Sequence, residues 1–468
     1  MSAELPLKTA AELLALLARR QVGALELTQA FLARIEGVDA RLNSYITVTA
    51  DAAVRTARRL DRQRGRRGPL HGLPVAVKDL CATKGIRTTA GSKILADWVP
   101  NYDATVVERW HAAGAVLLGK LNLHEFAYGV TTNNPHYGPT HNPWDAERVP
   151  GGSSGGSGAA VAAALCAGAI GTDTGGSIRI PAAACGVVGL KPTYGRVSRH
   201  GVVPLSWSLD HVGPLARSVE DAALLLGPIA GRDERDPTTS TRRVENYRAA
   251  LRRAPKGLTI GIPREHFFEL LDDHVRKAFE TAVAVLKRIG VRIQSISVPS
   301  FVEAQAAAVA IMAPEASAYH ARTLRARAAD FGADVRSMLE LGNMIPAATM
   351  VAAQRLRARL ASECAAAFQR VDAMVVPALA VPPPRFTDTV LHIGGTAVDP
   401  GLALSRNMMP FNLTGLPAIC LPCGRSPDGL PIGLQIAGRP FEESTILRLA
   451  HGYEQATPWH QERPPLGT

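Results

Sequence analysis

Long hydrophobic runs are absent from this sequence. No stretch of about 18 apolar residues occurs in the 468 residues, so a membrane-spanning helix is not expected. The N-terminus also lacks the basic start and apolar block of a secretory signal. Its leucines instead follow helical spacing behind Thr9, and Glu12 completes a capping-box pattern. We therefore expect a cytoplasmic protein with no membrane partner.

Cysteine is also scarce. Six residues are scattered through the chain, which favours reduced thiols over a disulfide framework. Cys420 and Cys423 have C-x-x-C spacing, but no second pair or nearby histidine cluster completes a zinc site. The 13 histidines form no H-E-x-x-H pattern, and we expect His124, His136 and His141 to be structural or pocket-lining. No metal and no cofactor are predicted.

Aromatic residues make up only 5% of the chain, and none lies in its most basic segment, residues 55–67. The formal net charge is +11, and such an arginine run can mark a nucleic-acid surface. Without aromatic side chains to stack on bases, it is more typical of a solvated helix that ends at a Gly-Pro turn. We expect no nucleic-acid partner. The arginines are Arg55, Arg58, Arg59, Arg62, Arg64, Arg66 and Arg67.

Short apolar runs alternate with Ala-rich helical segments through most of the chain. The runs are LPVAVKDL, AVLLGK, AGAIGTD, LTIGIP, VRIQSISVP, AMVVPAL, PAICLP and IGLQIAG. Each is bounded by Gly, Pro or polar residues, which is typical of strands. The alternation predicts an α/β protein with a central mixed β-sheet covered by helices on both faces.

One domain spanning residues 1–468 is expected, in four parts. Residues 1–65 are predicted to be helical, and 66–230 form a core that carries the candidate catalytic residues. The Ala- and Arg-rich region 300–370 interrupts the strand pattern and predicts an inserted or capping helical layer. Strand-like runs resume in 371–468, which predicts a return to the core sheet.

The stretch PGGSSGGSGAA, Pro150 to Ala160, has the composition of a flexible linker, a phosphate cradle or a catalytic backbone. A small-residue helix, GAAVAAALCAGA, follows directly, which argues against a linker. The G-x-S-x-G pattern suggests a nucleophile elbow, but an elbow needs a buried strand before it, and HNPWDAERVP is polar. Elsewhere, GAVLLGKL matches a phosphate loop except that Leu121 replaces the magnesium-binding Ser or Thr.

A second Gly-Ser segment, GTDTGGSIRIPAAACG, follows the apolar AGAIG. Its consecutive N–H groups from Thr174 to Ser177 could converge on one point, and its glycines permit the close approach of an oxyanion hole. Upstream, Lys78 ends a run with the pattern of a buried strand. Because burial lowers the pKa of a lysine, Lys78 is a candidate general base.

Together these segments resemble the amidase signature family, in matching order over nearly the whole chain. They are GLPVAVKDL, PGGSSGGS, GTDTGGSIRIPAAACGVVGLKPTYGRVS, SLDHVGPLARS, PFNLTGLPAICLP and GLPIGLQIAG. The family uses a Ser-Ser-Lys triad, and the spacing of Lys78, Ser153 and Ser177 agrees with it. The resemblance implies that Ser177 forms the acyl-enzyme, and that Ser153, on a cis peptide after Gly152, relays its proton to neutral Lys78.

The resemblance also implies the groups around this triad. The oxyanion hole would consist of backbone N–H groups of Thr174, Gly175, Gly176 and Ser177. Three residues would support the network, although structural hydrogen bonding explains them equally well: Ser154, Asp173 and Arg179. The expected substrate-binding residues are Ala127, Tyr128, Gly129 and Ile180.

The family includes the glutaminase subunit of the tRNA-dependent amidotransferase, which usually has glutamine after GGSIR and a DEFAMGSS segment. This chain has Ile180 and HEFAYGVTT instead. These departures favour a stand-alone hydrolase for a small-molecule amide, anilide, ester or carbamate, and the alternative is the glutaminase subunit. A basic nucleic-acid-associated protein is the least favoured alternative. The Leu, Met and Ala of region 300–350 favour an apolar or aromatic substrate, and a homodimer is an allowed assembly.

Overall fold

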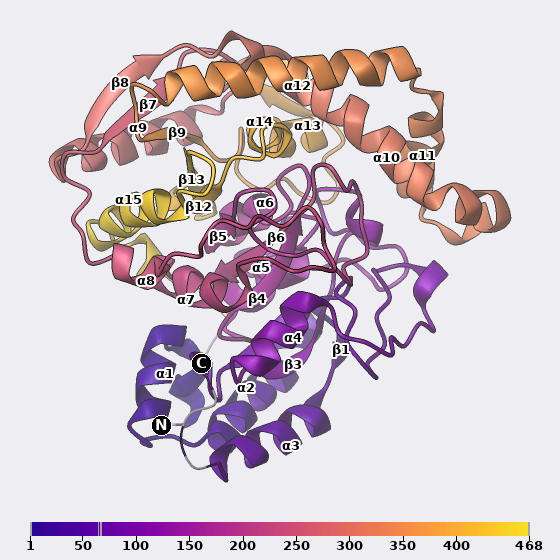
Figure 1. Cartoon of the computed structure of the whole chain (residues 1–468), viewed down its shortest axis with the longest axis vertical. Coiled ribbons are helices and arrows are strands. Elements are labelled where there is room, and N and C mark those ends of the chain that lie inside the picture. The colour runs from indigo at the N-terminus through magenta and orange to yellow at the C-terminus, as the bar shows by residue number, and fades with distance from the viewer. Residues whose placement is uncertain (1, 64, 66–67, 467–468) are drawn as a thin grey trace.

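Strands from both halves of the chain join in one β-sheet (Figure 1). The computed structural model describes residues 2–63, 65 and 68–466. In these residues the strands are β1 (Tyr45–Val48), β2 (Pro74–Lys78), β3 (Val116–Leu121), β4 (Ala169–Asp173), β5 (Val188–Lys191), β6 (His211–Ala216), β7 (Thr259–Pro263), β8 (Arg292–Ile296), β9 (Ala373–Pro377), β10 (Leu391–Ile393), β11 (Thr396–Val398), β12 (Ala418–Arg425) and β13 (Pro431–Gly438).

The main sheet of the described chain has eleven strands in the order β1-β3-β2-β4-β6-β5-β12-β13-β9-β7-β8, and β10 and β11 pair separately. Its pairing is mixed. β2 runs parallel to β3 and β4, whereas β4 and β6 are antiparallel, as are β12 and β13. Each of the apolar runs proposed as strands from the sequence overlaps one of these strands.

Helices flank the sheet. The α-helices are α1 (Ala10–Ala18), α2 (Ala24–Val38), α3 (Ala50–Asp61), α4 (Thr105–Ala112), α5 (Gly155–Ala162), α6 (Arg179–Cys185), α7 (Val219–Ile229), α8 (Tyr247–Ala250), α9 (Asp273–Arg288), α10 (Ala304–Arg327), α11 (Ala333–Met344), α12 (Ala347–Ala367), α13 (Pro400–Ser405), α14 (Met409–Leu413) and α15 (Glu443–Gln455). Short 3-10 helices are η1 (Ser2–Leu7), η2 (Asp39–Arg41), η3 (Lys93–Leu95), η4 (Glu125–Ala127), η5 (Pro299–Glu303), η6 (Ala328–Asp330) and η7 (Trp459–Gln461). The predicted α/β class with a central mixed sheet is confirmed.

The N-terminal segment is not wholly helical, and this part of the prediction was wrong. The capping box at Thr9 and Glu12 does form, and it begins α1. Between α2 and α3, however, the chain forms β1, which pairs antiparallel with β3 at the edge of the sheet. The four residues YITV comprise one aromatic and three β-branched side chains, and such residues fit a pleated edge.

Small residues allow α5 to pack closely against the strands. A Cβ added at Gly156 would lie 2.4 Å from the carbonyl oxygen of Asn122 and 2.6 Å from that of Ser44. Every residue of α5 is buried. The Gly-Ser stretch is therefore part of the tightly packed interior, and its glycines are required by close backbone approach.

Three helices from region 300–370 form a layer at one end of the molecule, drawn in orange tones at the top and right of Figure 1. The 24-residue α10 packs against α11, α12 and α14. Because α14 belongs to the C-terminal part, this layer is joined to the chain that returns to the sheet.

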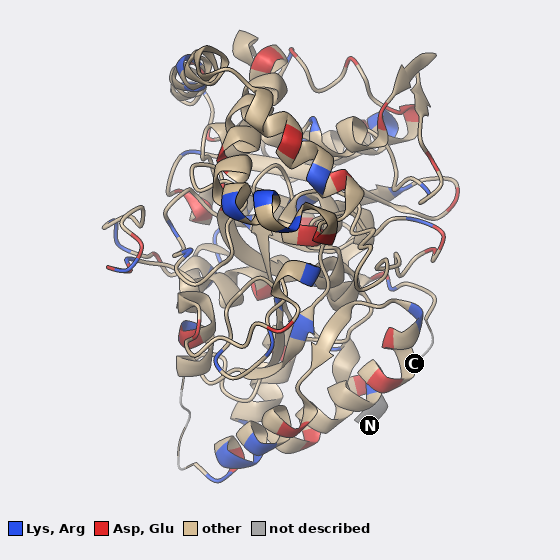
Figure 2. Cartoon of the chain, turned by 90° about the vertical axis from the view of Figure 1, so that its right-hand side faces the viewer, with Lys and Arg blue, Asp and Glu red and all other residues tan. Residues whose placement is uncertain are grey.

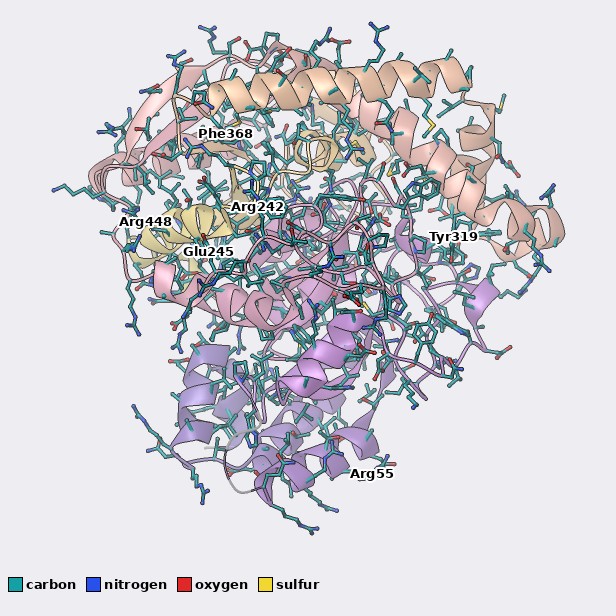
Figure 3. The ribbon with its side chains drawn as sticks, in the orientation of Figure 1. Arg55, Arg242, Glu245, Tyr319, Phe368 and Arg448 are labelled. Carbon is teal, nitrogen blue, oxygen red and sulfur yellow. The ribbon has the colours of Figure 1, made fainter. Side chains whose placement is uncertain are left out.

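Charged residues are interspersed over the ribbon in the view of Figure 2. Of the basic run, Arg55, Arg58 and Arg59 lie in α3 and are exposed, opposite a buried face. Figure 3 shows Arg55 pointing outward. Arg62 is exposed just beyond the helix, and Arg64, Arg66 and Arg67 lie outside the described residues. No helix among the described residues is long and apolar enough to cross a membrane.

Candidate active site

Lys78 is the last residue of β2 and is completely buried. Its Nζ donates to Ser153 Oγ (2.7 Å) and to Thr172 Oγ1 (2.9 Å). Thr172 is close because β4 lies beside β2 in parallel, so both strands end at the same edge of the sheet. Burial lowers the pKa of Lys78 to about 7 because the charged form has lost its water. A large fraction of this lysine is therefore neutral near pH 7.

The turn that carries Ser153 is fixed by hydrogen bonds to its backbone. The Gly152–Ser153 peptide bond is cis. His124 N–H donates to the carbonyl oxygen of Ser153 (3.1 Å), and the Thr132 hydroxyl donates to that of Gly151 (2.9 Å). These contacts leave the side chain of Ser153 directed at Lys78, as the hydrogen bond between them shows.

Ser154 joins the turn to the segment that carries Ser177. Its N–H donates to the carbonyl oxygen of Ser177 (3.2 Å), and its Oγ donates to that of Thr172 (3.2 Å). No direct hydrogen bond links Ser153 Oγ and Ser177 Oγ among the contacts of the described residues. Such catalytic contacts are often long before substrate binds. The structure thus brings Lys78 and Ser153 into contact and holds Ser177 beside them through Ser154.

Ser177 opens onto a cavity of about 670 Å³. The cavity is lined by the turn after β4, by the segment around η4, and by α10, α11 and α13. Its lining residues are Ala127, Tyr128, Gly129, Val130, Gly175, Ser177, Leu205, Gln305, Val309, Met312, Ala313, Met338, Leu341, Met344, Ile345, Pro346, Thr349, Asp399, Gly401, Leu402, Ser405 and Met409. A smaller cavity of about 250 Å³ reaches Thr172 and Thr174 from the side of residues 199–212.

Three of the four substrate-binding residues expected from the sequence line the larger cavity: Ala127, Tyr128 and Gly129. The fourth, Ile180, does not. It lies in the first turn of α6, fully buried, with its side chain against the backbone of Gly176 and Gly151. Its position near the nucleophile in sequence was misleading, because α6 turns the side chain away from the cavity into the core.

The backbone N–H groups after β4 divide into two sets. The N–H of Gly176 donates to Asp173 Oδ1 (2.9 Å), so it is already engaged. This differs from the oxyanion hole of four donors expected for Thr174, Gly175, Gly176 and Ser177. The φ of Gly176 is +121°, and a Cβ there would lie 2.6 Å from Met408 Cβ. Glycine is required here to wrap the turn around the carboxylate.

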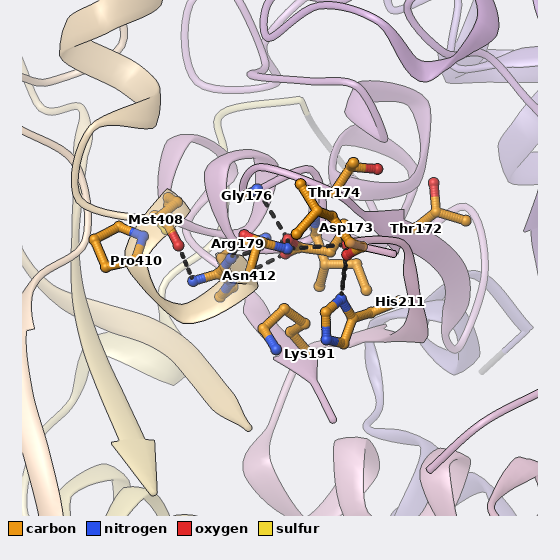
Figure 4. Close-up of polar contacts among 12 residues, drawn as sticks. Thr172, Asp173, Thr174, Gly176, Arg179, Lys191, His211, Met408, Pro410 and Asn412 are labelled. Carbon is orange, nitrogen blue, oxygen red and sulfur yellow. Dashed lines mark hydrogen bonds and ion pairs between the residues drawn. The ribbon is translucent and has the colours of Figure 1, made fainter. Parts of the chain in front are cut away.

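Asp173 and Arg179 form a buried ion pair under this turn (Figure 4). Arg179 Nη2 lies 2.9 Å from Asp173 Oδ1, and its Nε donates to Oδ2 (3.0 Å). Ile178 N–H and Asn412 Nδ2 also donate to the carboxylate. Burial opposes the ionisation of Asp173, but the Arg179 guanidinium outweighs it and holds the pKa of that carboxyl well below its usual range. The pair anchors both ends of the turn that bears Ser177.

Sequence reasoning assigned no role to Thr172 or to Asn412. Thr172 lies two residues before Thr174 in GTDTGGS, so the alternation of a strand was the signal that could have placed it beside Lys78. Asn412 lies in PFNLTGLP, which drew attention only as a family segment. Its Nδ2 donates to the Asp173 carboxylate (2.8 Å) and its Oδ1 accepts from Arg179 Nη2 (2.6 Å). The C-terminal part of the chain thereby completes the anchor.

The histidines near the site make structural contacts. His124 Nε2 lies 2.9 Å from Asp334 Oδ2, and His136 Nε2 lies 2.9 Å from Glu125 Oε1. His141 Nδ1 contacts the carbonyl oxygen of Ala146 (2.7 Å). Within the described part of the chain, no three His, Cys, Asp or Glu residues are grouped so that they could hold a metal ion. All six cysteines are buried free thiols.

The fold and this site define a class of enzyme, and comparison with known proteins agrees. The family model "Amidase" matches residues 26–447. The chain therefore belongs to the amidase signature family, whose members act on C–N bonds.

Particular relatives are similar over the whole length. A subunit of the glutamyl-tRNA(Gln) amidotransferase of Moorella thermoacetica is 43% identical over 492 residues, covering 99% of each chain. A solved vestigial protein complex, which reveals the evolutionary origins of an s-triazine catabolic enzyme, has a chain with a TM-score of 0.92 and 37% identity. The match covers 96% of this chain and 98% of that one. A solved amidase has a TM-score of 0.87 and 34% identity over 96% of this chain and 99% of its own.

Proposed function

We propose that this chain cleaves a carboxylic amide through an acyl-enzyme on Ser177, with Ser153 as the proton relay and Lys78 as the base. The observation that carries the proposal is the buried contact of Lys78 Nζ with Ser153 Oγ at 2.7 Å, beside a serine that opens onto a cavity. A neutral Nζ has a lone pair that accepts the hydroxyl proton of Ser153. One N–H of the same amine still donates to Thr172.

The proposed first step forms the acyl-enzyme. Ser177 Oγ attacks the carbonyl carbon while its proton passes to Ser153 Oγ, and the proton of Ser153 passes to Lys78 Nζ. The tetrahedral intermediate then loses the amine, which takes a proton back along the same path. Because a free amide anion is a poor leaving group, this returned proton is as necessary as the attack. Water repeats the sequence on the acyl-enzyme and releases the acid.

The negative oxygen of the intermediate needs donors that are free before the reaction. The N–H groups of Gly175 and Ser177, with Thr174, remain candidates, since the N–H of Gly176 is bound to Asp173. An essential donor of this kind contributes about 3 to 4 kcal/mol of transition-state stabilisation. The Asp173–Arg179 pair holds the segment in place, so the donors need no rearrangement during the step.

The test is hydrolysis of a panel of alkyl and aryl amides, an ester and a carbamate by the purified chain. Ser177→Ala should lower kcat/KM by about 1,000-fold or more, as loss of a nucleophile does. The matched control is Ser157→Ala in α5, whose Oγ donates to the carbonyl oxygen of Ile170 and does not line the cavity. A fluorophosphonate should label Ser177. An adduct on Ser153 would reverse the two serine roles, and full activity in Ser177→Ala would overturn the proposal.

A second candidate function rests on the relatives. Their name, which makes them subunits of glutamyl-tRNA(Gln) amidotransferase, favours the glutaminase alternative over the stand-alone hydrolase expected from Ile180 and HEFAYGVTT. The same acyl-enzyme would then release ammonia from glutamine for use by partner proteins, and the expectation of no nucleic-acid partner would be wrong. Ammonia release that appears only when partner proteins and tRNA are added would establish this function. Amide hydrolysis by the chain alone would establish the first.

A further inference from the structure

The cavity at Ser177 carries almost no charge. Among its described lining residues, Asp399 is the one ionisable acid, and no lysine, arginine or histidine is present. Asp399 is exposed at the edge, where Oδ1 accepts the N–H of Leu402 (2.8 Å) at the start of α13. The inner wall has only neutral polar groups. These are Tyr128, Gln305, Thr349 and Ser405, and Gln305 Nε2 donates to Ser405 Oγ (3.4 Å).

Methionine is concentrated in this wall. Four of the eight methionines of the chain line the cavity: Met312, Met338, Met344 and Met409. An unbranched thioether side chain changes shape at low energetic cost and packs against apolar ligands of different outlines. The remaining large apolar side chains come from α10 and α11, on the helical layer that extends away from the sheet.

The apolar surface continues out of the cavity. Val309, Leu341 and Met344 are lining residues, yet they are 40%, 60% and 75% exposed. Large hydrophobic side chains that are this exposed lose stability unless something covers them. Their place at the mouth indicates that the covering group is the outer part of a ligand whose inner end lies at Ser177.

We propose that the acyl group of the substrate is uncharged and apolar, long enough to reach from Ser177 to the mouth formed by Val309, Leu341 and Met344. The proposal rests on the amide-cleaving function above and names its substrate class. An acyl chain that carries a carboxylate, as glutamine does, would lose its hydration without finding a cation. Asp399 at the edge would repel it further, whereas a neutral alkyl or aryl acyl chain meets matching surface throughout.

The experiment compares two anilides that share the same scissile bond. One has a hexanoyl group, and the other is the mono-anilide of adipic acid, in which a carboxylate replaces the terminal methyl. We expect kcat/KM to be about 100-fold or more higher for hexanoyl, since an unpaired carboxylate is costly to bury. Equal rates, or a preference for the anionic acyl chain, would overturn the proposed substrate class.

A charge placed in the wall should change this preference. Met312→Lys puts an ammonium in the cavity with little change in length, and it should narrow the ratio of the two kcat/KM values by at least about 10-fold. Ala306→Lys is the matched control, because Ala306 is exposed on the same helix and does not line the cavity. An equal change of the ratio in both variants would show that the cavity does not sense the acyl charge.

Binding separates this inference from the proposed function. In the Ser177→Ala variant, calorimetry with the hexanoyl anilide and with L-glutamine measures recognition without turnover. Tighter binding of the anilide supports the substrate class even if the assignment of the nucleophile is wrong. Binding of glutamine with equal or greater affinity by the single chain would overturn the substrate class, whereas hydrolysis by Ser177→Ala would overturn the nucleophile alone.

Discussion

The pKa of Lys78 should be visible in the pH dependence of kcat/KM. If the neutral amine is the base, activity should rise with pH in a single step whose midpoint is near 7, because burial lowers the pKa of Lys78 to about that value. The sign follows from the active form, which is the deprotonated one. Well below pH 7 most of the enzyme carries the ammonium and is inactive.

Thr172→Val tests this origin of the step. The Thr172 hydroxyl accepts from Nζ at 2.9 Å, and this contact favours the charged amine over the neutral one. A hydrogen bond to a charged group contributes about 1.5 to 3 kcal/mol, and one to a neutral group about 0.5 to 1.5 kcal/mol. The difference of about 1 to 1.5 kcal/mol corresponds to roughly 0.7 to 1.1 pKa units. We therefore expect the midpoint to move down by that amount.

The assay is a pH series of kcat/KM from about 5 to 9 with a neutral amide, in buffers of constant ionic strength. Thr28→Val is the matched control: Thr28 is also buried, and its Oγ1 has no hydrogen-bond partner in the described chain. Its midpoint should equal that of the wild type. A rate that does not change over this range, or a midpoint that moves up in Thr172→Val, would refute Lys78 as the base.

Three further predictions concern the frame around the site. Arg179→Met leaves the buried Asp173 carboxylate without its cation and should lower the free energy of unfolding by about 3 to 5 kcal/mol; a loss under 1 kcal/mol in denaturant unfolding would contradict the anchoring role. Gly156→Ala should destabilise the fold and abolish activity because its Cβ has no space. The matched Gly37→Ala in α2, with nothing within 4 Å, should be neutral or stabilising, and equal melting temperatures would argue against close packing at α5. All six thiols should resist a maleimide in the native protein and react after unfolding, because they are buried.

The strands that the sequence predicted are those with continuous apolar runs, and they include β2 and β4, which carry the site. The strands that it missed have other patterns. β6 contains Pro214, which pairs with Ile170 in the middle of the sheet, and proline ordinarily argues against a central strand. β1 and β5 have four residues each, too few for a period to be visible. Tertiary pairing decides such short segments.

For the site, the sequence could indicate residue types but not how their hydrogen-bonding capacity is divided. The approach of Lys78 to Ser153 was predictable from the family resemblance. That the N–H of Gly176 is committed to Asp173 was not, because it depends on the turn geometry at a positive φ. Ile180 illustrates a second limit: one helical turn reverses the direction of a side chain, and only α6 in place shows which way it points.

The separate origins of the catalytic strands and the helical wall have a consequence for how this protein could change. The lysine and serines lie within 100 consecutive residues, whereas most of the acyl-binding surface comes from α10 and α11, beginning at Ala304. Substitutions in those helices alter the shape and polarity that a substrate meets, yet they leave the proton path in place. The same hydrolytic machinery can therefore be adapted to new acyl groups one methionine at a time, and transplanting α10 and α11 between relatives is a practical route to altered selectivity.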